Sequence, residues 1–553
     1  MGGPAGDAEH AADRAGPAGV PATVPALVRD AAARHADVEA VVDGDARVTY
    51  AKLGRLVDAA ARAHLAAGVE PGDRVALWAP NGLDWVVAAL GAQAAGAVLV
   101  PLSTRLKGTE AAYVLGRSRA RVLVVVGDFL GTRYPAMLDG RDLPDLRAVA
   151  VLDGPEGGAD AVVAAAARPG TTTWPAFLAA GATVEGADAE ARARSVRPDD
   201  PADLMFTSGT TGRPKGVLCS HAQDLRVFEV WASTVGLRIG DRYLLVNPMS
   251  HSFGYKAGIL ACLLAGATML PLPSFDVDAV VDLVARERAT VLPGPPTLYQ
   301  AMLHHPRRAD ADLSSLRLAV TGAAAVPTSL VERMRADLGF TTVVTAYGLT
   351  ESTGMVTICR PDDDAETIAT TSGRAIPGVE VRVVDDAGRE VRRGEPGEIV
   401  CRGHNVMQGY FEDPEATAEA IDADGWLHTG DIGTMDERGY VRITDRKKDM
   451  FIVGGFNAYP AEIEDLLLSH PDIAQVAVVG VPDERLGEVG VAYVVPAPGT
   501  DPSPDDIMAW ARATMANYKV PRRVVVVDAL PLNASGKVLK YELRQRATAG
   551  ATT

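Results

Sequence analysis

The sequence predicts an α/β protein: a large N-terminal domain of mostly parallel sheets with a small β-barrel-like subdomain, followed by a small C-terminal α+β domain. Three observations predict it. Strand and helix patterns alternate from about Val24 to Val126, as in parallel sheets with crossover helices. From Val379 the pattern changes to short β segments separated by glycines, which indicates a small barrel-like or antiparallel subdomain. After Asp445 a further α+β pattern spans about a hundred residues, an ordinary size for one domain.

Taken in order, the elements follow from apolar periodicity and from turn residues. Ala159–Arg194 is alanine-rich and poorly periodic, so surface helix and loop are expected there. Predicted helices are Ala26–His35, Ala51–Ala67, Leu83–Gly96, His221–Val235, a helix starting at Pro460, and Pro504–Ala516. Predicted strands are Arg47–Tyr50, Arg74–Trp78, Ala97–Pro101, Arg121–Val126, Arg242–Val246, Ala289–Pro293, Leu316–Val320, Val343–Tyr347, Val381–Val384, Glu398–Arg402, Tyr440–Ile443, Val476–Gly480, Val491–Val495 and Arg523–Val527.

Length and charge bound the class of protein. A chain of 553 residues is too long for one ordinary core, so at least two domains are expected. The boundaries we predict are a tail at 1–21, an N-terminal domain at 22–444, a C-terminal domain at 445–547 and a tail at 548–553. The first tail is rich in Gly, Ala and Pro, lacks the apolar core of a signal peptide, and is expected to be disordered. The net charge of −17 disfavours nucleic acid or an anionic membrane as the main partner.

Two long uncharged runs, Trp85–Thr104 and Ala257–Phe275, approach the ~20 residues that a membrane span needs. Glycines and prolines interrupt both runs, so each is predicted to be a buried helix followed by a strand, and no integral membrane segment is expected. The cysteines are widely spaced and form no CxxC pair. They fit reduced, mostly buried thiols in a cytoplasmic protein, and are Cys219, Cys262, Cys359 and Cys401.

One loop of the N-terminal domain has the composition of a phosphate-binding loop. Glycines let amide N–H groups converge on one point, hydroxyl side chains add donors, and a lysine adds a point charge. The pattern is not the Walker motif, because no GK[ST] opens a helix after it. A flexible linker is the alternative, although linkers rarely follow a buried strand such as Leu204–Phe206. The residues are Thr207, Ser208, Gly209, Thr210, Thr211, Gly212 and Lys215.

Three other strand ends carry polar or small residues. The turn from Tyr347 to Glu351 offers a ring, the hydroxyl of Thr350 and a carboxylate, which could stack on a base, hold a phosphate and ligate a hard cation; a solvated turn is the alternative. Asp431 follows a glycine turn and could accept hydrogen bonds from a ribose diol. Small side chains after another strand would let a flat ligand lie against the backbone: Gly322, Ala323 and Ala324.

Three further sequence features suggest a function but also have a purely structural explanation. His251 lies among proline, glycine and aromatic residues at a strand exit, which suggests a pocket wall, yet taken alone a structural histidine is favoured. The charge run Asp445–Asp449 is typical of a solvated face. Lys537 follows Gly536 on a loop near the terminus, where an ordinary exposed lysine is the alternative. Lysines are few in this chain because arginine supplies most of the positive charge, so a lysine is less readily explained as surface filling.

In order and spacing, the motifs resemble the adenylate-forming superfamily of acyl-CoA synthetases, luciferases and non-ribosomal adenylation domains. The resemblance implies a reaction of a small-molecule carboxylic acid with ATP, Mg²⁺ and CoA: an acyl-adenylate forms with release of pyrophosphate, and then a thioester with release of AMP. It also implies a mobile C-terminal domain. The matching motifs, within about Val24–Arg544, are Thr207–Gly216, Tyr347–Glu351, Gly425–Asp431, Asp445–Asn457 and Gly536–Lys537; Leu532 and Asn533 depart from the residues common in relatives.

The resemblance implies a role for each matching residue. The loop from Thr207 to Lys215 would hold the β- and γ-phosphates, and Thr210 would join Glu351 at Mg²⁺. Tyr347 and Gly348 would contact adenine beside Gly322, Ala323 and Ala324. Thr350 would contact the α-phosphate, Asp431 and Arg446 the ribose, Lys537 the substrate carboxylate and the α-phosphate, Gly455 the pantetheine channel and His251 the acyl pocket, with Asp445 as the hinge.

At finer grain, three segments resemble an actinobacterial branch of CoA ligases for a steroid-derived indane-dione propanoate: Phe253–Cys262, Val291–Gln300 and Ile452–Pro460. Lys256 lies within the first. We hypothesise that it recognises oxygen atoms on a bicyclic acid, because a cation among apolar residues needs a polar partner. A lysine that faces solvent or the CoA phosphates is the alternative.

The leading hypothesis is therefore an AMP-forming acid–CoA ligase that acts on a fatty acid or on a steroid-derived bicyclic propanoic acid. One alternative is adenylation with transfer to a carrier-protein thiol, although no carrier segment follows Arg544. The other is a catalytically silent adenylate-binding protein, against which Lys537, Glu351 and Asp431 argue. A cytoplasmic location is expected, and whether the chain forms a homodimer is left open.

Overall fold

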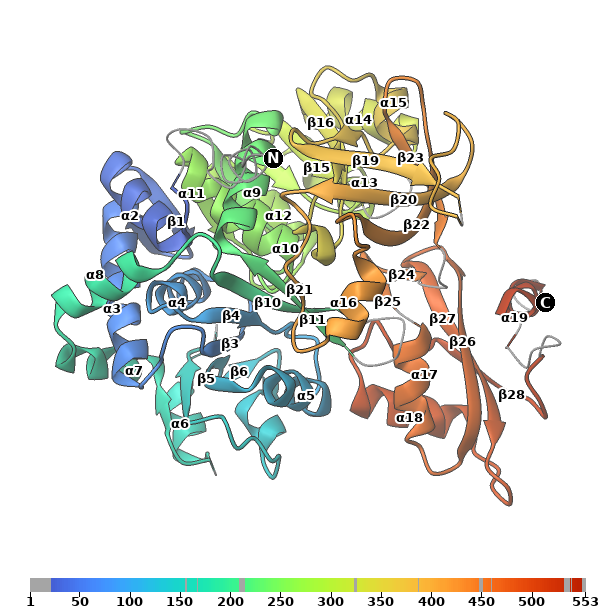
Figure 1. Ribbon diagram of the computed structural model, residues 1–553, viewed down its shortest axis with the longest axis horizontal. Coiled ribbons are helices and arrows are strands. Elements are labelled where there is room, and N and C mark those ends of the chain that lie inside the picture. The colour runs from blue at the N-terminus through green and yellow to red at the C-terminus, as the bar shows by residue number, and fades with distance from the viewer. Residues whose placement is uncertain are drawn as a thin grey trace, which may run out of the picture.

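Two bodies of unequal size make up the computed structural model: a large one that extends from Val24 to Arg446 and a small one that begins at Phe451 (Figure 1). In the described part of the chain, every helix is too short or too polar to cross a bilayer. The structure describes residues 21–154, 157–166, 168–207, 214–322, 326–385, 387–446, 451–458, 460–531, 538 and 540–549.

The first sheet of the large body is mostly parallel, and its strand ends supply several candidate site residues. Its central strands are fully buried and read as continuous apolar runs, as expected where helices cover both faces. Antiparallel pairs occur only toward its two edges, among the strands described. In sheet order the strands are β18 (Arg374–Ala375), β17 (Thr357–Ile358), β16 (Thr342–Tyr347), β15 (Leu318–Thr321), β14 (Val291–Pro293), β12 (Arg242–Leu245), β13 (Thr268–Pro271), β1 (Glu39–Asp43) and β2 (Ala46–Thr49).

The second sheet is parallel from β10 to β9 and carries an antiparallel hairpin at its other edge. That hairpin, β10 with β11, flanks the predicted phosphate loop. In sheet order the strands are β21 (Gly409–Tyr410), β11 (Lys215–Ser220), β10 (Pro201–Thr207), β4 (Val98–Pro101), β3 (Arg74–Trp78), β5 (Ala120–Val126), β8 (Ala148–Leu152) and β9 (Thr171–Thr173).

Helix α4 (Leu83–Ala94) is apolar around its whole circumference and is buried from Trp85 to its end. It packs on α2 (Val24–Arg34) and α3 (Tyr50–Ala66), and it contacts strands of both sheets, as an all-apolar helix should. Strand β4 follows it directly, so the prediction of a buried helix and strand in place of a membrane span is confirmed. The second uncharged run is confirmed likewise as the helical segment through α11 (Ala261–Ala265) followed by β13.

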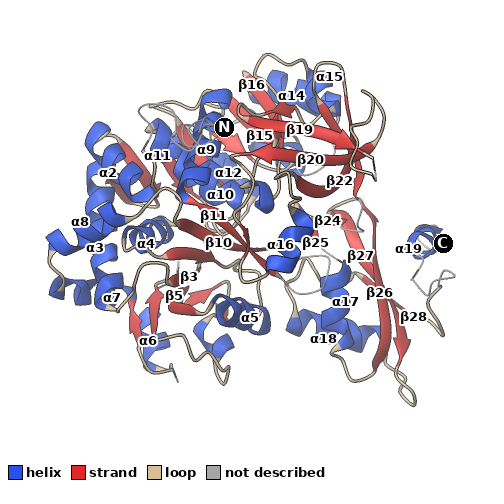
Figure 2. Ribbon diagram, in the orientation of Figure 1, coloured by secondary structure: helices blue, strands red, loops and turns tan. Residues whose placement is uncertain are grey.

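Other helices of the large body pack on the faces of its sheets or on one another (Figure 2). Segment Ala159–Arg194, expected to be helix and loop, also contains β9 at the sheet edge, where three β-branched threonines favour an extended backbone. The helices are α5 (Gly108–Ser118), α6 (Ala159–Ala164), α7 (Trp174–Ala180), α8 (Gly186–Ser195), α9 (His221–Val235), α12 (Val277–Glu287), α13 (Pro296–Leu303), α14 (Thr328–Leu338), α15 (Ala365–Thr370) and α16 (Pro414–Ala420).

The predicted glycine-punctuated subdomain is an antiparallel sheet at the top of Figure 1. Its order is β19 (Val379–Val384), β20 (Gly397–Gly403), β22 (Leu427–Met435) and β23 (Val441–Arg446). β22 alternates buried and half-buried residues, the pattern of a strand with one face on the core. This strand carries Asp431 toward the large parallel sheet.

The small body is a mixed sheet with helices on both faces. Alternate residues of its long strand β26 (Ile473–Asp483) enter different cores: Val476 and Val478 pack under α17 (Pro460–Leu468) and α18 (Pro504–Thr514), whereas Ala477 and Val479 pack under α19 (Lys540–Ala549). Helix α19 therefore lies on the outer side of this sheet, at the right edge of Figure 1. The other strands are β24 (Phe451–Val453), β25 (Phe456–Ala458), β27 (Gly487–Pro496) and β28 (Arg523–Val526).

Candidate active site

The predicted phosphate loop lies between β10 and β11 in the sequence. Thr207 and Lys215 are register partners at the open end of the β10–β11 hairpin, so they bracket the loop between them. A Cβ on Gly216, next to this end, would lie 2.6 Å from a methyl carbon of Leu204, so the leucine side chain would have to shift. The remaining predicted loop residues lie outside the described part of the chain: Ser208, Gly209, Thr210, Thr211 and Gly212.

Glu351 lies close to Thr207, where this loop begins, on the single helical turn Thr350–Ser352. Its Oε1 accepts hydrogen bonds from the Thr207 hydroxyl at 3.2 Å and from the Tyr410 hydroxyl at 3.0 Å. The ammonium of Lys215 lies 5.1 Å from the Tyr410 ring centroid. The structure thus brings together a carboxylate, hydroxyls and a cation that the sequence placed in separate motifs, and it adds Tyr410, which sequence reasoning missed.

The donor set around Glu351 fits Mg²⁺. Mg²⁺ prefers oxygen ligands, and in phosphate-using enzymes one or two carboxylates hold it together with substrate phosphates. Among the residues that the structure describes, no group of three or more His, Cys, Asp or Glu side chains could hold a metal by itself. One carboxylate beside a phosphate loop agrees with that mode of binding.

A second group joins the large sheet to the antiparallel subdomain. The Tyr347 hydroxyl donates a hydrogen bond of 2.6 Å to Oδ2 of Asp431, which is buried. Burial, the charge of Asp431 and this hydrogen bond together raise the pKa of Tyr347 well above its ordinary value, so the phenol stays protonated. Asp431 is the register partner of Arg446 in the β22–β23 pair. The predicted adenine and ribose contacts therefore come from adjacent elements.

Close backbone approach explains two glycines of this group. A Cβ on Gly348 would lie 2.3 Å from the Gly354 carbonyl oxygen, so no side chain fits there. A Cβ on Gly322 would lie 2.9 Å from the carbonyl oxygen of Ala346, which places Gly322 against β16 just before Tyr347. Ala323 and Ala324, predicted beside Gly322, lie outside the described residues.

The candidate residues for the acid and for CoA lie on different elements. His251 is exposed, and its Nδ1 accepts a hydrogen bond of 3.2 Å from the Phe253 amide at the start of α10 (Ser252–Gly254). Gly455, in the turn between β24 and β25, lies against Pro295 of the large body, since a Cβ on it would be 3.7 Å from the Pro295 Cβ. Lys537 lies outside the described residues.

The hypothesis for Lys256 is wrong, and so is its solvent-facing alternative. The Lys256 ammonium lies 3.0 Å from Oδ2 of Asp203 and 2.7 Å from Oδ1 of Asp224, and all three side chains are 0% exposed. Burial alone would lower the pKa of Lys256, but the two carboxyl groups outweigh it and raise that pKa well above its ordinary value. The polar partner that the lysine needs is therefore internal, and no oxygen of a substrate is required to explain it.

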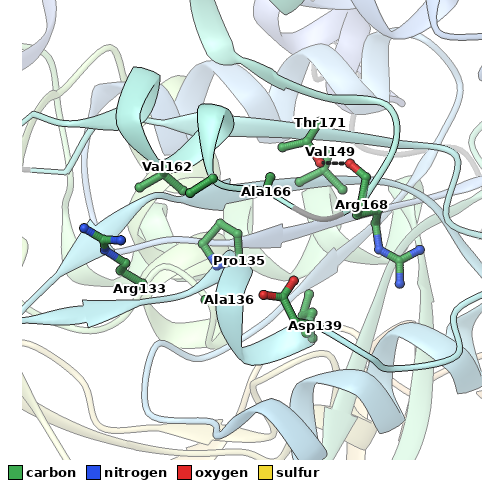
Figure 3. A pocket seen from close by; sticks show the side chains of 11 residues that line it. Arg133, Pro135, Ala136, Asp139, Val149, Val162, Ala166, Arg168 and Thr171 are labelled. Atoms are coloured by element: carbon green, nitrogen blue, oxygen red, sulfur yellow. Dashed lines mark hydrogen bonds between the residues drawn. The ribbon is translucent and has the colours of Figure 1, made fainter.

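A separate small pocket lies away from these residues, between Pro135–Leu138 and α6 (Figure 3). Its volume is about 60 Å³ and its lining is mostly apolar, including Pro135, Val149 and Val162. It contains none of the candidate site residues and has too little room for a nucleotide or a bicyclic acid, so we assign it no role in the site.

A large body in contact with a smaller C-terminal body, and the residues gathered around Glu351 and Asp431, are what is expected of a nucleotide-using enzyme. The sequence matches the family model of the AMP-binding enzyme over residues 28–411 and that of the AMP-binding enzyme C-terminal domain over residues 462–537. The chain belongs to the AMP-binding enzyme family. It is an AMP-forming acid–thiol ligase, of a family that uses ATP, Mg²⁺ and CoA to form an acyl-adenylate and then a thioester.

Individual proteins are similar to this chain over nearly their full length. The chain is 52% identical over 526 residues to 3-[(3aS,4S,7aS)-7a-methyl-1,5-dioxo-octahydro-1H-inden-4-yl]propanoyl:CoA ligase of Rhodococcus jostii (strain RHA1), covering 95% of this chain and 99% of the relative. It is 51% identical over 523 residues to the ligase of the same name from Mycobacterium tuberculosis (strain ATCC 25618 / H37Rv), covering 95% and 98%. A solved structure, the amide bond synthetase McbA from Marinactinospora thermotolerans, matches with a TM-score of 0.80 at 32% identity, covering 95% of this chain and 99% of that chain.

Proposed function

We propose that this protein ligates CoA to a steroid-derived bicyclic propanoic acid, with a fatty acid as the alternative substrate. The observation that carries the proposal is the identity of 51–52%, over nearly full length, to two relatives named as ligases of an indane-dione propanoate. A cytoplasmic location is proposed with it, since every cysteine is buried and free.

The site residues are proposed to act as follows. Lys215 and the loop that starts at Thr207 hold the β- and γ-phosphates, Glu351 is the carboxylate for Mg²⁺, and Thr350 contacts the α-phosphate. Tyr347, kept protonated, orients Asp431 through their hydrogen bond of 2.6 Å, and Asp431 contacts a ribose hydroxyl. Supporting evidence is the convergence of Thr207, Glu351 and Tyr410 and the adjacency of β16 to β22 through Tyr347 and Asp431.

Charge explains why the reaction needs this arrangement. A carboxylate is a weak nucleophile, and its attack on ATP brings two anions together, so cations positioned at the phosphates lower the barrier. Bound Mg²⁺ would supply further charge stabilisation at the phosphate oxygens. Lys215 lies at the β- and γ-phosphate side, and Lys537 is proposed to serve the α-phosphate and the acid. The resulting mixed anhydride is then opened by the CoA thiol.

The acceptor is a separate question, because a solved relative at 32% identity is an amide bond synthetase. An assay with ATP, Mg²⁺, a panel of acids and either CoA, a carrier protein or an amine answers it. We expect AMP release that depends on both CoA and the bicyclic acid. AMP release with an amine in place of CoA would contradict the proposed acceptor, and the absence of any pyrophosphate would favour a silent adenylate-binding protein.

The proposed role of Lys537 gives a direct test of the two-step mechanism. Lys537→Ala should reduce acyl-adenylate formation by about a hundredfold or more, because a charge positioned at the transition state is lost. Thioester formation from supplied acyl-adenylate should change by less than about threefold, since the C-terminal domain is proposed to have turned and carried Lys537 away before that step. Pyrophosphate release and thioester formation are measured separately, and an equal loss in both would contradict the mechanism.

A further inference from the structure

A buried group of three charged side chains joins the two bodies. The Lys519 ammonium, from the segment between α18 and β28, lies 2.8 Å from Oε1 of Glu110 on α5 and 2.6 Å from Oε1 of Glu462 on α17. The side chains of Lys519, Glu110 and Glu462 are 4%, 7% and 5% exposed. Glu110 belongs to the large body and the other two to the small body, so the lysine bridges them. We call Glu110, Lys519 and Glu462 the interdomain triad.

Each half of the triad also has a partner within its own body. The other oxygen of Glu110, Oε2, accepts a hydrogen bond of 2.8 Å from the Lys107 amide at the start of α5, which fixes its side chain. Glu462 holds Lys519 within the small body. Docking therefore brings a fixed carboxylate to a prepositioned cation, which favours one relative placement of the two bodies.

The neighbouring contacts show which face of the small body is docked. The guanidinium of Arg105, just before α5, lies 3.6 Å from the ring centroid of Phe456, and that ring lies 5.1 Å from the ring of Tyr518. Phe456 follows Gly455, which lies against Pro295. The turn that carries Gly455 thus faces the large body. Helix α19, which begins shortly after Lys537, packs on the opposite face of the sheet.

We propose that the interdomain triad is a latch that holds the small body in the placement used for thioester formation, and that Glu110 and Lys519 are positioning residues for that half-reaction. This inference rests on the proposed two-step function. In the docked placement the charges are paired and shielded from water. When the small body turns away for adenylation, both halves regain water, so the latch opens without leaving a buried unpaired charge.

The latch also discriminates against other placements. A docking that buried Glu110 without Lys519 would leave a carboxylate desolvated and unpaired, which is strongly unfavourable. The pair thereby makes the orientation of Gly455 against Pro295 depend on charge as well as on shape. Neither Glu110 nor Lys519 needs to touch a substrate to do this.

The first test separates the half-reactions in two variants. Lys519→Met and Glu110→Gln should each slow thioester formation from supplied acyl-adenylate by about tenfold or more, because truncation of one partner of a buried charge pair weakens docking. Acid-dependent pyrophosphate release should stay within about twofold of wild type. In the double variant the loss should be smaller than the product of the single losses, since both variants remove the same pair.

The matched control is Arg546→Met, which removes an ion pair with Glu542 on the exposed surface of α19 and leaves the interface intact. It should change neither half-reaction. Equal losses of both half-reactions in Lys519→Met and Glu110→Gln would overturn the latch, as would multiplicative effects in the double variant.

A second experiment measures the placement of the small body against the large body without relying on catalysis. A Cβ on Gly455 would lie 3.7 Å from the Cβ of Pro295, within disulfide range, and the native cysteines are buried. Under a mild thiol oxidant, the variant Pro295→Cys/Gly455→Cys should cross-link, and adding Lys519→Met should slow the cross-linking several-fold. An unchanged rate would overturn the latch. Because this readout needs no acid, ATP or CoA, it stands even if the proposed function fails.

Discussion

Two buried lysines, Lys256 and Lys519, are each held between two carboxyl groups, but the elements that they join are different. Asp203 and Asp224, the partners of Lys256, lie on β10 and α9 of the same body. Lys519 has one partner in each body. We call Lys256, Asp203 and Asp224 the Lys256 group. Water can reach this group only if the large body opens, whereas it reaches the interdomain triad whenever the small body turns away. The first group is suited to permanent structure and the second to a contact that is broken and remade.

The position of the Lys256 group shows what it holds. Lys256 lies on the π-helical turn Tyr255–Leu260, directly after the His251 segment, and Asp203 lies on the strand that leads to Thr207. The group thereby connects the proposed acid-binding side to the base of the phosphate loop. Single π-helical turns occur often at functional sites, where they set the direction of nearby side chains. We therefore expect Lys256 to influence the site through this connection and not through contact with the acid.

The largest expected effect is that of Lys256→Met on stability. The substitution leaves two carboxyl groups buried without their cation, and breaking a buried pair from one side costs about 3–5 kcal/mol. We expect a loss of that size in the unfolding free energy of the large body, measured by denaturant unfolding. The control is Arg333→Met, which removes an exposed pair with Asp337 on α14 and should cost less than about 0.5 kcal/mol.

The variant Lys256→Met also distinguishes a structural role of Lys256 from a role in recognising the acid. Activity of Lys256→Met on oxygenated bicyclic acids and on plain fatty acids should fall in the same proportion, because the lysine touches neither. A variant with wild-type stability and a loss confined to oxygenated acids would contradict the structural role.

A smaller effect on stability is expected for Lys519→Met. When the pair is lost, the small body can undock and water can reach Glu110 and Glu462, so the cost approaches that of an exposed pair, about 1 kcal/mol or less. Denaturant unfolding of the large body measures it beside Lys256→Met. A loss as large as that of Lys256→Met would mean that the two bodies stay docked throughout, and it would remove the difference between the two lysines.

The fold was predictable because its signals are local. Strands β3, β4 and β5 and helices α3, α4 and α9 were predicted within about two residues of their observed ends, as the apolar period and the turn residues specify each of them separately. Helix α4 was recognised as buried because polar residues are almost absent from it. Strand β9 was missed, since a run of three threonines in an alanine-rich stretch carries no alternation to detect.

The sequence motifs identified the site residues, but they did not predict which of these residues contact one another. Glu351 and Asp431 were proposed separately, yet nothing local in the sequence indicates that Tyr410 donates to Glu351 or that Tyr347 donates to Asp431. The partners of Lys256 and Lys519 were missed for the same reason: pairing between distant segments depends on the fold. The one available signal was the scarcity of lysine, which makes each lysine notable but does not identify its partners.

Asp224→Asn should have the smallest effect and sharpens the description of the Lys256 group. A charged lysine and two carboxyl groups together have no net charge only if one of the carboxyl groups keeps its proton. Burial first, and the charge of Asp203 second, raise the pKa of Asp224 well above its ordinary value, so we expect Asp224 to keep the proton. Asparagine has the shape of the neutral acid: its amide can donate to Asp203 and its oxygen can accept from Lys256. At pH 4 or below, where the unfolded chain also keeps the proton, we expect a change in unfolding free energy of about 0.5 kcal/mol or less, against the several kcal/mol of Lys256→Met.

The protonation of Asp224 also predicts how the unfolding free energy changes with pH. Because the folded protein holds the Asp224 proton at a pH where the unfolded chain has released it, this residue makes stability fall as pH rises above about 4. Asp224→Asn removes that contribution, so the unfolding free energy of the variant should fall less between pH 4 and pH 7 than that of wild type. Denaturant unfolding at a series of pH values measures the two slopes. A steeper fall in the variant would show that Asp224 is ionised in the folded state, and the Lys256 group would then carry a net negative charge.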